Sequence, residues 1–168
     1  MTKEQTVLLV DDCENDSLLM RIAFDKAQFE SVLQCVDNGE KAIAYLNGDG
    51  PFGDRNNFPL PTVALLDLNM PKKTGFDVLA WVRTQPDLKR IPIIVVTASA
   101  HTADVERAFD LGANGYLVKP SEVEQLVGMV RCLRQWLEIN QFPPLHQGGK
   151  MAEEITHEES RDRPSLRR

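Results

Sequence analysis

Hydrophobic residues fall into five short, nearly continuous runs, separated by segments in which they recur every three or four positions. Runs without alternation are typical of strands that are buried on both faces of a sheet. The runs cover residues 6–10, 31–36, 62–67, 91–98 and 115–120. Helical spacing follows each run, over residues 16–27, 41–46, 76–83, 103–111 and 122–140. This alternation predicts a doubly wound α/β fold: a five-stranded parallel sheet with helices on both faces.

Turn-forming residues separate these segments and also divide the chain. Residues 37–39 (Asp-Asn-Gly) indicate a turn, Gly112 is placed to cap a helix, and residues 47–61 predict a long loop rich in Gly, Pro and Asn. Beyond two consecutive prolines the chain becomes polar, with charges of both signs. We therefore predict a folded domain over residues 1–142 and a disordered tail over residues 143–168.

Polar side chains follow four of the five predicted strands. Strand one ends in Asp11 and Asp12, strand three in Asp67, strand four in Thr97 and strand five in Lys119. The carboxyl ends of parallel strands meet at one edge of a sheet, and in the order 2-1-3-4-5 these four strands are neighbours. The side chains are therefore expected to surround one pocket.

The chemistry of this group favours a divalent cation. Carboxylates packed together repel one another, and a hard cation such as Mg²⁺ removes the repulsion. Lys119 supplies a positive charge and Thr97 a hydroxyl group. Such a site can neutralise a phosphoryl group during transfer, and an aspartate can be its covalent acceptor.

Each of these residues also has an ordinary interpretation when it is taken alone. An Asp after a strand is most often a turn residue or a helix N-cap. Asn15 or Asp16 can cap the following helix, which leaves Asp11 and Asp12 free for another role. The joint placement at four strand ends is what favours a functional site.

Charge and composition narrow the classes of partner and compartment. The net charge of −6 argues against a broad surface for nucleic acid. No apolar stretch approaches the roughly 20 residues of a membrane span, and no signal segment is expected at the N-terminus. Cys13, Cys35 and Cys132 show neither disulfide nor metal spacing, so we expect a reduced, cytoplasmic protein.

With these residues in place, the chain resembles the receiver domain of two-component response regulators, which has the flavodoxin-like receiver fold. The resemblance extends over residues 7–137, nearly all of the predicted domain. Four motifs carry it: "LLVDD" (8–12), "LLDLNMPKKTGFDVL" (65–79), "VVTAS" (95–99) and "GYLVKP" (115–120).

The resemblance implies a role for each acidic residue of the group. Asp67 would be the phosphoryl acceptor. Asp11 and Asp12 would be the acidic pair that binds Mg²⁺ together with Asp67, and Asp12 would be the more direct ligand of the two. The backbone carbonyl of Asn69 would complete the protein ligands.

Further roles are implied for residues of the last two strands. Thr97 would hydrogen-bond the phosphoryl oxygens, and Lys119 would form an ion pair with them. Tyr116 would be the aromatic switch residue that moves inward when Thr97 is drawn to the phosphoryl group. The family also suggests a cis peptide bond before Pro120.

More narrowly, the chain is similar to small stand-alone receivers that pair with bacterial phytochrome kinases. The long loop, the "DLNMPKKTG" run and "LRQWLEINQFPP" (133–144) carry this similarity. It implies phosphoryl transfer from a sensor histidine kinase, a bacteriophytochrome, and output through protein contacts or a phosphorelay. The protein would be a phosphoacceptor switch and no enzyme beyond Mg²⁺-dependent self-phosphorylation and autodephosphorylation. Trp136 and Leu137 would either support a homodimer or pack against the sheet.

Three alternatives compete with this reading. A phosphorylation-independent adaptor with an intact pocket would have the same sequence pattern. An aspartyl-phosphate hydrolase of the haloacid dehalogenase class would want a second acid where Asn69 stands. A flavodoxin-like FMN protein would need a Ser/Thr/Gly-rich phosphate loop, whereas "DDCEND" follows the first strand.

Overall fold

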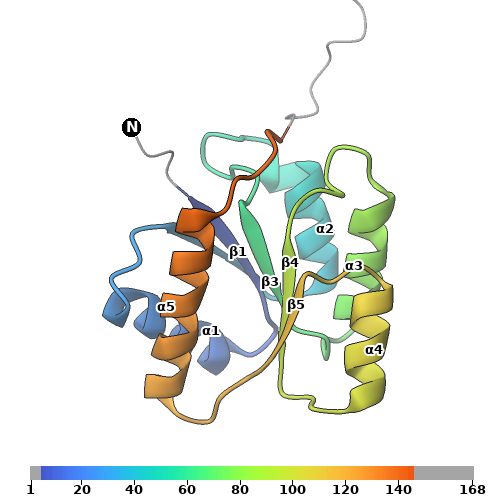
Figure 1. The fold of residues 1–168 in the computed structure, drawn as a ribbon. Helices are drawn as coiled ribbons and strands as arrows, with labels where there is room; N and C mark the ends of the chain where they lie inside the picture. The colour runs from blue at the N-terminus through green and yellow to red at the C-terminus, as the bar shows by residue number, and fades with distance from the viewer. Residues whose placement is uncertain (1–4, 146–168) are drawn as a thin grey trace, which may run out of the picture.

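The computed structural model describes residues 5–145, and these form a parallel sheet in the order β2-β1-β3-β4-β5 (Figure 1). The strands are β1 (Thr6–Val10), β2 (Val32–Val36), β3 (Val63–Leu66), β4 (Ile93–Thr97) and β5 (Gly115–Val118). The helices are α1 (Glu14–Lys26), α2 (Gly39–Asn47), α3 (Gly75–Thr84), α4 (Thr102–Asp110) and α5 (Val123–Ile139). The predicted fold class and strand order are confirmed. The predicted tail lies outside the described residues except for its first three, so it stays a prediction.

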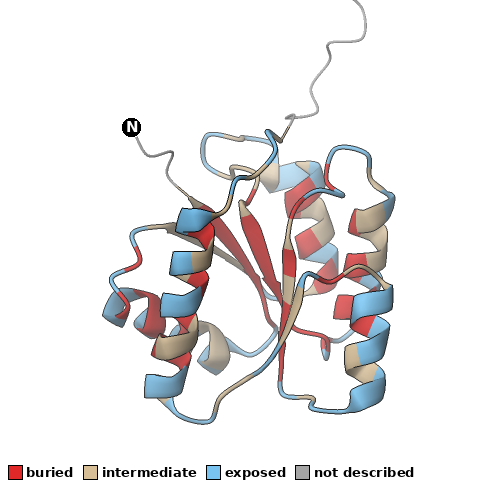
Figure 2. Cartoon of the chain, in the orientation of Figure 1, coloured by how far each residue is buried: buried red, intermediate tan, exposed pale blue. Residues whose placement is uncertain are grey.

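Two hydrophobic cores cover the two faces of the sheet (Figure 2). Successive side chains of β1 point to opposite faces, so Val7 and Leu9 enter one core and Leu8 and Val10 the other. α1 and α5 close the first face, and α2, α3 and α4 close the second (Figure 1). β1, β3 and most of β4 are therefore buried on both sides, which explains why their sequences do not alternate.

The two apolar residues near the end of α5 differ in their burial. Leu137 is buried in the core that α1 and α5 share. Trp136 is half-buried and packs edge-on against Phe142, with ring centroids 5.5 Å apart. Packing against the domain therefore accounts for Leu137, whereas Trp136 keeps part of its surface exposed.

The long loop after α2 is more ordered than its composition predicted. It contains a short 3-10 helix, η1 (Gly50–Phe52), and is anchored by Arg55. The Arg55 guanidinium donates to the carbonyls of Tyr45 and Leu46, each at 2.8 Å, at the end of α2. These bonds satisfy helix carbonyls that have no partner within the helix.

Helix boundaries follow local capping signals at several points. The predicted turn at 37–39 is the start of α2, where the Asn38 side chain accepts the Lys41 N–H at 2.8 Å. Gly112 follows the C-cap of α4 with φ +91°, the left-handed conformation that glycine adopts without strain.

In the described part of the chain, no helix has the length and apolar character that crossing a bilayer requires.

The start of α3 lies directly against the end of β3. Gly75 donates its N–H to the Leu68 carbonyl at 3.0 Å. A Cβ at this position would overlap the Asp67 carbonyl and lie 2.8 Å from the Leu68 Cα. Only a glycine lets the helix begin this close to the segment that carries Asp67.

We expect Gly75→Ala to lower the free energy of unfolding by about 1–3 kcal/mol, because backbone atoms cannot move away from the new methyl group. Gly128→Ala is the matched control, since a Cβ on this glycine of α5 meets nothing within 4 Å. The control should be neutral or stabilising by about 0.5–1 kcal/mol. Urea denaturation measures both, and equal stabilities would contradict the close approach.

Candidate functional site

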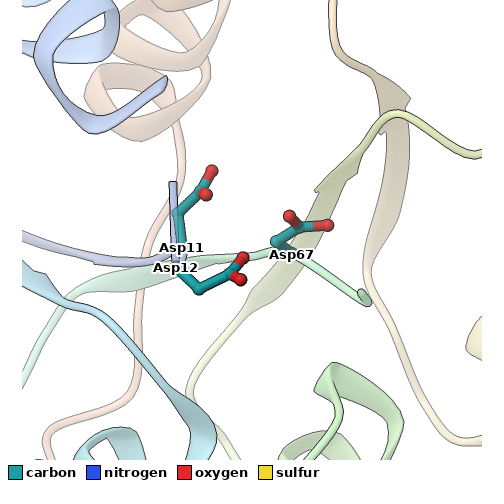
Figure 3. Close-up of side chains that lie close together, drawn as sticks. All are labelled: Asp11, Asp12 and Asp67. Atoms are coloured by element: carbon teal, nitrogen blue, oxygen red, sulfur yellow. The ribbon is translucent and has the colours of Figure 1, made fainter. Parts of the chain in front are cut away.

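Three carboxylates meet at the carboxyl edge of the sheet, as predicted (Figure 3). Asp11 and Asp12 follow β1, and Asp67 follows the neighbouring strand β3. One oxygen of each side chain lies within 4.8 Å of an oxygen of the others. Asp11 and Asp67 are buried and Asp12 is exposed, so the group opens to solvent on one side.

Backbone bonds fix the two buried carboxylates. The Asp67 N–H extends the sheet by donating to the Val10 carbonyl at 2.9 Å. Asp11 Oδ1 accepts the Cys13 N–H at 3.0 Å, and Asp67 Oδ1 accepts the Asn69 N–H at 3.3 Å. Each aspartate thus binds the backbone two residues further on, a turn that sets the direction of its side chain. The other oxygen of each carboxylate, Oδ2, makes no backbone bond and faces the Lys119 ammonium.

Lys119 neutralises part of this charge. Its Nζ lies 2.8 Å from Asp11 Oδ2, 2.8 Å from Asp16 Oδ2 and 2.9 Å from Asp67 Oδ2. Burial by itself would lower the pKa of Lys119, but its hydrogen bonds to the three carboxylates outweigh that effect and raise it. Burial also raises the pKa of Asp11, against the opposing effect of Lys119. The net negative charge that Lys119 leaves on the carboxylates is therefore energetically unfavourable in this buried environment.

Asp16 is the site residue that sequence reasoning missed. We expected Asn15 or Asp16 to cap the first helix, and that expectation is wrong. α1 begins two residues earlier, with Cys13 at the N-cap and no side-chain capping bond. Asp16 lies in the first turn of α1 and its carboxylate reaches Lys119 instead. Lys119 is 103 residues away in the sequence, so no local sequence pattern predicted this contact.

Thr97 ends β4 and Tyr116 lies in β5, the two strands that follow β3 in the sheet. Thr97 is fully buried at the end of β4, and its carbonyl accepts the Lys119 N–H at 2.8 Å. The Tyr116 hydroxyl donates to the Ser99 carbonyl at 3.0 Å, and burial raises its pKa. Tyr116 is thus connected to the loop that follows Thr97.

The peptide bond between Lys119 and Pro120 differs from the expectation. The resemblance suggested a cis bond, but the described residues contain no cis peptide bond. The bond is trans, the isomer that X–Pro sequences favour in general. Lys119 reaches the carboxylates from this trans arrangement.

The donor set fits a hard divalent cation. Such ions prefer carboxylate and carbonyl oxygens, and Asp11, Asp12 and Asp67 supply three carboxylates from rigid strand ends. A cation would also offset the burial that raises the pKa of Asp11. Asp16 is not a member of this group.

A parallel sheet in this order, with an acidic triad and a lysine at its carboxyl edge, defines the receiver class of signalling domain. Comparison with known proteins leads to the same class. The family profile of the response regulator receiver domain matches residues 7–131. The chain belongs to this family.

Phytochrome response regulators are among its similar proteins. Response regulator Rcp1 of Synechocystis sp. is 37% identical over 140 residues, 83% of this chain and 93% of the relative. The crystal structure of phosphorylated RcpA, a cyanobacterial phytochrome response regulator, superimposes with a TM-score of 0.78 at 32% identity, covering 84% of this chain and all of that one. Mn²⁺-bound Rcp1 superimposes with a TM-score of 0.73 over 83% of this chain and 99% of that one.

The acidic group predicts a measurable stabilisation by divalent metal. A ligand of the folded state at 100 times its Kd should raise the free energy of unfolding by about 2.7 kcal/mol. We expect Mg²⁺ or Mn²⁺ to raise the Tm of the wild type, EDTA to reverse the rise, and Asp12→Ala to abolish most of it. Glu14→Gln removes an exposed carboxylate close by and should keep the rise. A rise in Asp12→Ala equal to that of the wild type would rule out this site.

Lys119 and a bound metal would share the same carboxylates, so they should compete. Lys119→Met leaves Asp11 and Asp67 without their cation, and we expect it to lower metal-free stability by about 1–3 kcal/mol. The same change should increase the affinity for Mg²⁺, because the competing charge is gone. Calorimetric titration of both proteins measures the affinities, and weaker Mg²⁺ binding in the variant would contradict the competition.

Proposed function

We propose that this receiver is a phosphoacceptor switch in which Asp67 takes a phosphoryl group from a phosphohistidine of a sensor histidine kinase. The observation that carries the proposal is the environment of Asp67. Its Oδ2 lies 2.9 Å from the Lys119 ammonium, and oxygens of Asp11 and Asp12 lie within 4.8 Å of an oxygen of Asp67. A carboxylate that contacts a cation and lies beside two further metal ligands is suited to accept a phosphoryl group.

The residues divide the work of the transfer. An oxygen of Asp67 forms a bond to phosphorus while the bond from phosphorus to the histidine nitrogen breaks, and the nitrogen keeps the electron pair. Lys119 forms an ion pair with the phosphoryl oxygens, and the Thr97 hydroxyl hydrogen-bonds to one of them. Asp11, Asp12, Asp67 and the Asn69 carbonyl would hold Mg²⁺, whose charge would offset that of the phosphoryl group.

The same residues link the reaction to a change of surface. Thr97 moves towards the phosphoryl group, and Tyr116 moves inward as the loop around Ser99 follows. Two contacts support this coupling: Lys119 N–H to the Thr97 carbonyl, and the Tyr116 hydroxyl to the Ser99 carbonyl. The surface of α4, β5 and α5 is then the output surface, through protein contacts or onward transfer in a phosphorelay.

The proposed kinase is a bacteriophytochrome in the cytoplasm. The support is the similarity to RcpA and Rcp1 and to the bacteriophytochrome response regulator AtBRR, whose structure has a TM-score of 0.66. The protein would catalyse only its own Mg²⁺-dependent phosphorylation and autodephosphorylation. A homodimer through the end of α5 would use Trp136 and the exposed Ile139, because Leu137 is buried.

The test uses acetyl phosphate as the phosphodonor and intact mass as the readout. We expect the wild type to gain one phosphoryl group in Mg²⁺ and none in EDTA. Asp67→Ala should gain none, whereas Asp87→Ala, which removes an exposed aspartate, should behave as the wild type. A folded wild type without an adduct would move the assignment to a phosphorylation-independent adaptor. Phosphotransfer from purified kinases then identifies the donor.

A further inference from the structure

Asp16 stands at a helix position where an acidic residue usually caps its own helix. It is the third residue of α1 after the N-cap Cys13, and Asp77 holds the same position in α3. Asp77 forms a complete capping box, with its carboxylate accepting the Thr74 N–H at 2.8 Å. Asp16 makes no such bond, so the two equivalent aspartates differ in what they bind.

The reason lies in the residue that begins α1. The Cys13 side chain forms no capping bond, and the Cys13 N–H already donates to Asp11 Oδ1 at 3.0 Å. Both halves of a capping box are therefore lost at this helix. The Asp16 carboxylate is free to reach the Lys119 ammonium, 2.8 Å away.

Asp16 accepts one of the few hydrogen bonds that the Lys119 ammonium can donate. A lysine ammonium has three N–H donors; Asp16 and Asp67 each accept one, and Asp11 Oδ2 forms an ion pair with the same ammonium at 2.8 Å. Of these three carboxylates, only Asp16 stands outside the group that can hold a metal ion. Its side chain is 35% exposed, against 4% for Asp11 and 8% for Asp67. It is thus the one partner of Lys119 that neither a metal nor a phosphoryl group would engage.

We propose that Asp16 is a positioning residue that competes for the Lys119 ammonium and thereby limits how strongly Lys119 binds a phosphoryl group on Asp67. This proposal rests on the proposed function of the site. Asp16 adds negative charge beside the phosphoryl group and holds one of the three donors that could serve it. Its presence favours binding of the cation and opposes retention of the anion.

Asp16→Asn should therefore shift two affinities in opposite directions. The amide keeps the size of the side chain and removes its charge. At saturating Mg²⁺ we expect beryllofluoride, a phosphoryl mimic, to bind about three- to tenfold more tightly to the variant. Mg²⁺ alone should bind about two- to threefold more weakly. Lys119 would then pair more strongly with Asp11 and Asp67, and the site would have lost one negative charge. Calorimetry measures both, and Asp16→Ser is measured alongside.

Glu14→Gln is the matched control for charge alone. Glu14 lies in the same turn of α1, is exposed and has no ion pair with Lys119 in the described structure. Its substitution should change beryllofluoride affinity less than Asp16→Asn does. In a Lys119→Met background, Asp16→Asn should have no more effect than Glu14→Gln, because the residue through which it acts is missing.

The outcomes separate this inference from the function on which it rests. If the folded wild type binds no beryllofluoride in Mg²⁺, the proposed function fails. If the wild type binds it and Asp16→Asn behaves as Glu14→Gln, or weakens both affinities together, the inference about Asp16 alone is overturned. If Asp16 had a merely structural role, its substitution would weaken both affinities together, since local damage weakens cation and anion binding alike. Thermal melts of each variant confirm that the domain is folded.

Discussion

The site depends on one electrostatic constraint: three carboxylates at the edge of the sheet share the ammonium of Lys119. Asp11 and Asp67 are buried, and Lys119 is the positive group that contacts both. Burial disfavours each of these charges separately, yet the pKa of Lys119 is raised because its ion pairs outweigh the loss of solvent. The arrangement persists because the strands that carry it are held by two hydrophobic cores.

The same constraint explains why the surrounding backbone is so closely packed. Carboxylates that repel one another stay together only if their chain segments cannot move apart. β1 and β3 are adjacent and buried on both faces, and the Asp67 N–H is tied to the Val10 carbonyl. α3 begins so close to the end of β3 that its first residue, Gly75, has no room for a side chain. The rigidity of the edge is thus supplied by packing that has no chemical role of its own.

Sequence patterns predicted the parts of this structure that local and periodic signals determine. Continuous apolar runs identified strands buried on both faces, and the rule that parallel strands end at one edge brought Asp11, Asp12, Asp67 and Lys119 together. The start of α1 was misplaced because Asp16 has the chemistry of a helix cap. Its actual partner is the lysine that follows β5, and a contact across 103 residues leaves no periodic signal in the sequence.

The loop after α2 is a second case in which the sequence did not reveal a tertiary contact. Its Gly, Pro and Asn content correctly indicated the absence of a long helix or strand. Composition could not reveal that one residue, Arg55, would fasten the loop to the carbonyls at the end of α2. Long polar side chains find such partners only after the main elements are in place, so their role depends on tertiary geometry.

The position of Lys119 connects the charge balance to the proposed output surface. It directly follows β5, the strand that carries Tyr116, and its N–H is bonded to the carbonyl of the buried Thr97. A change in what the ammonium binds therefore acts on a strand whose other contacts lead to Ser99 and α4. In the proposed function, a phosphoryl group on Asp67 changes what the Lys119 ammonium binds, and this change biases the position of β5. The charge balance at the carboxylates and the shape of the α4–β5 surface would then change together, in one two-state equilibrium.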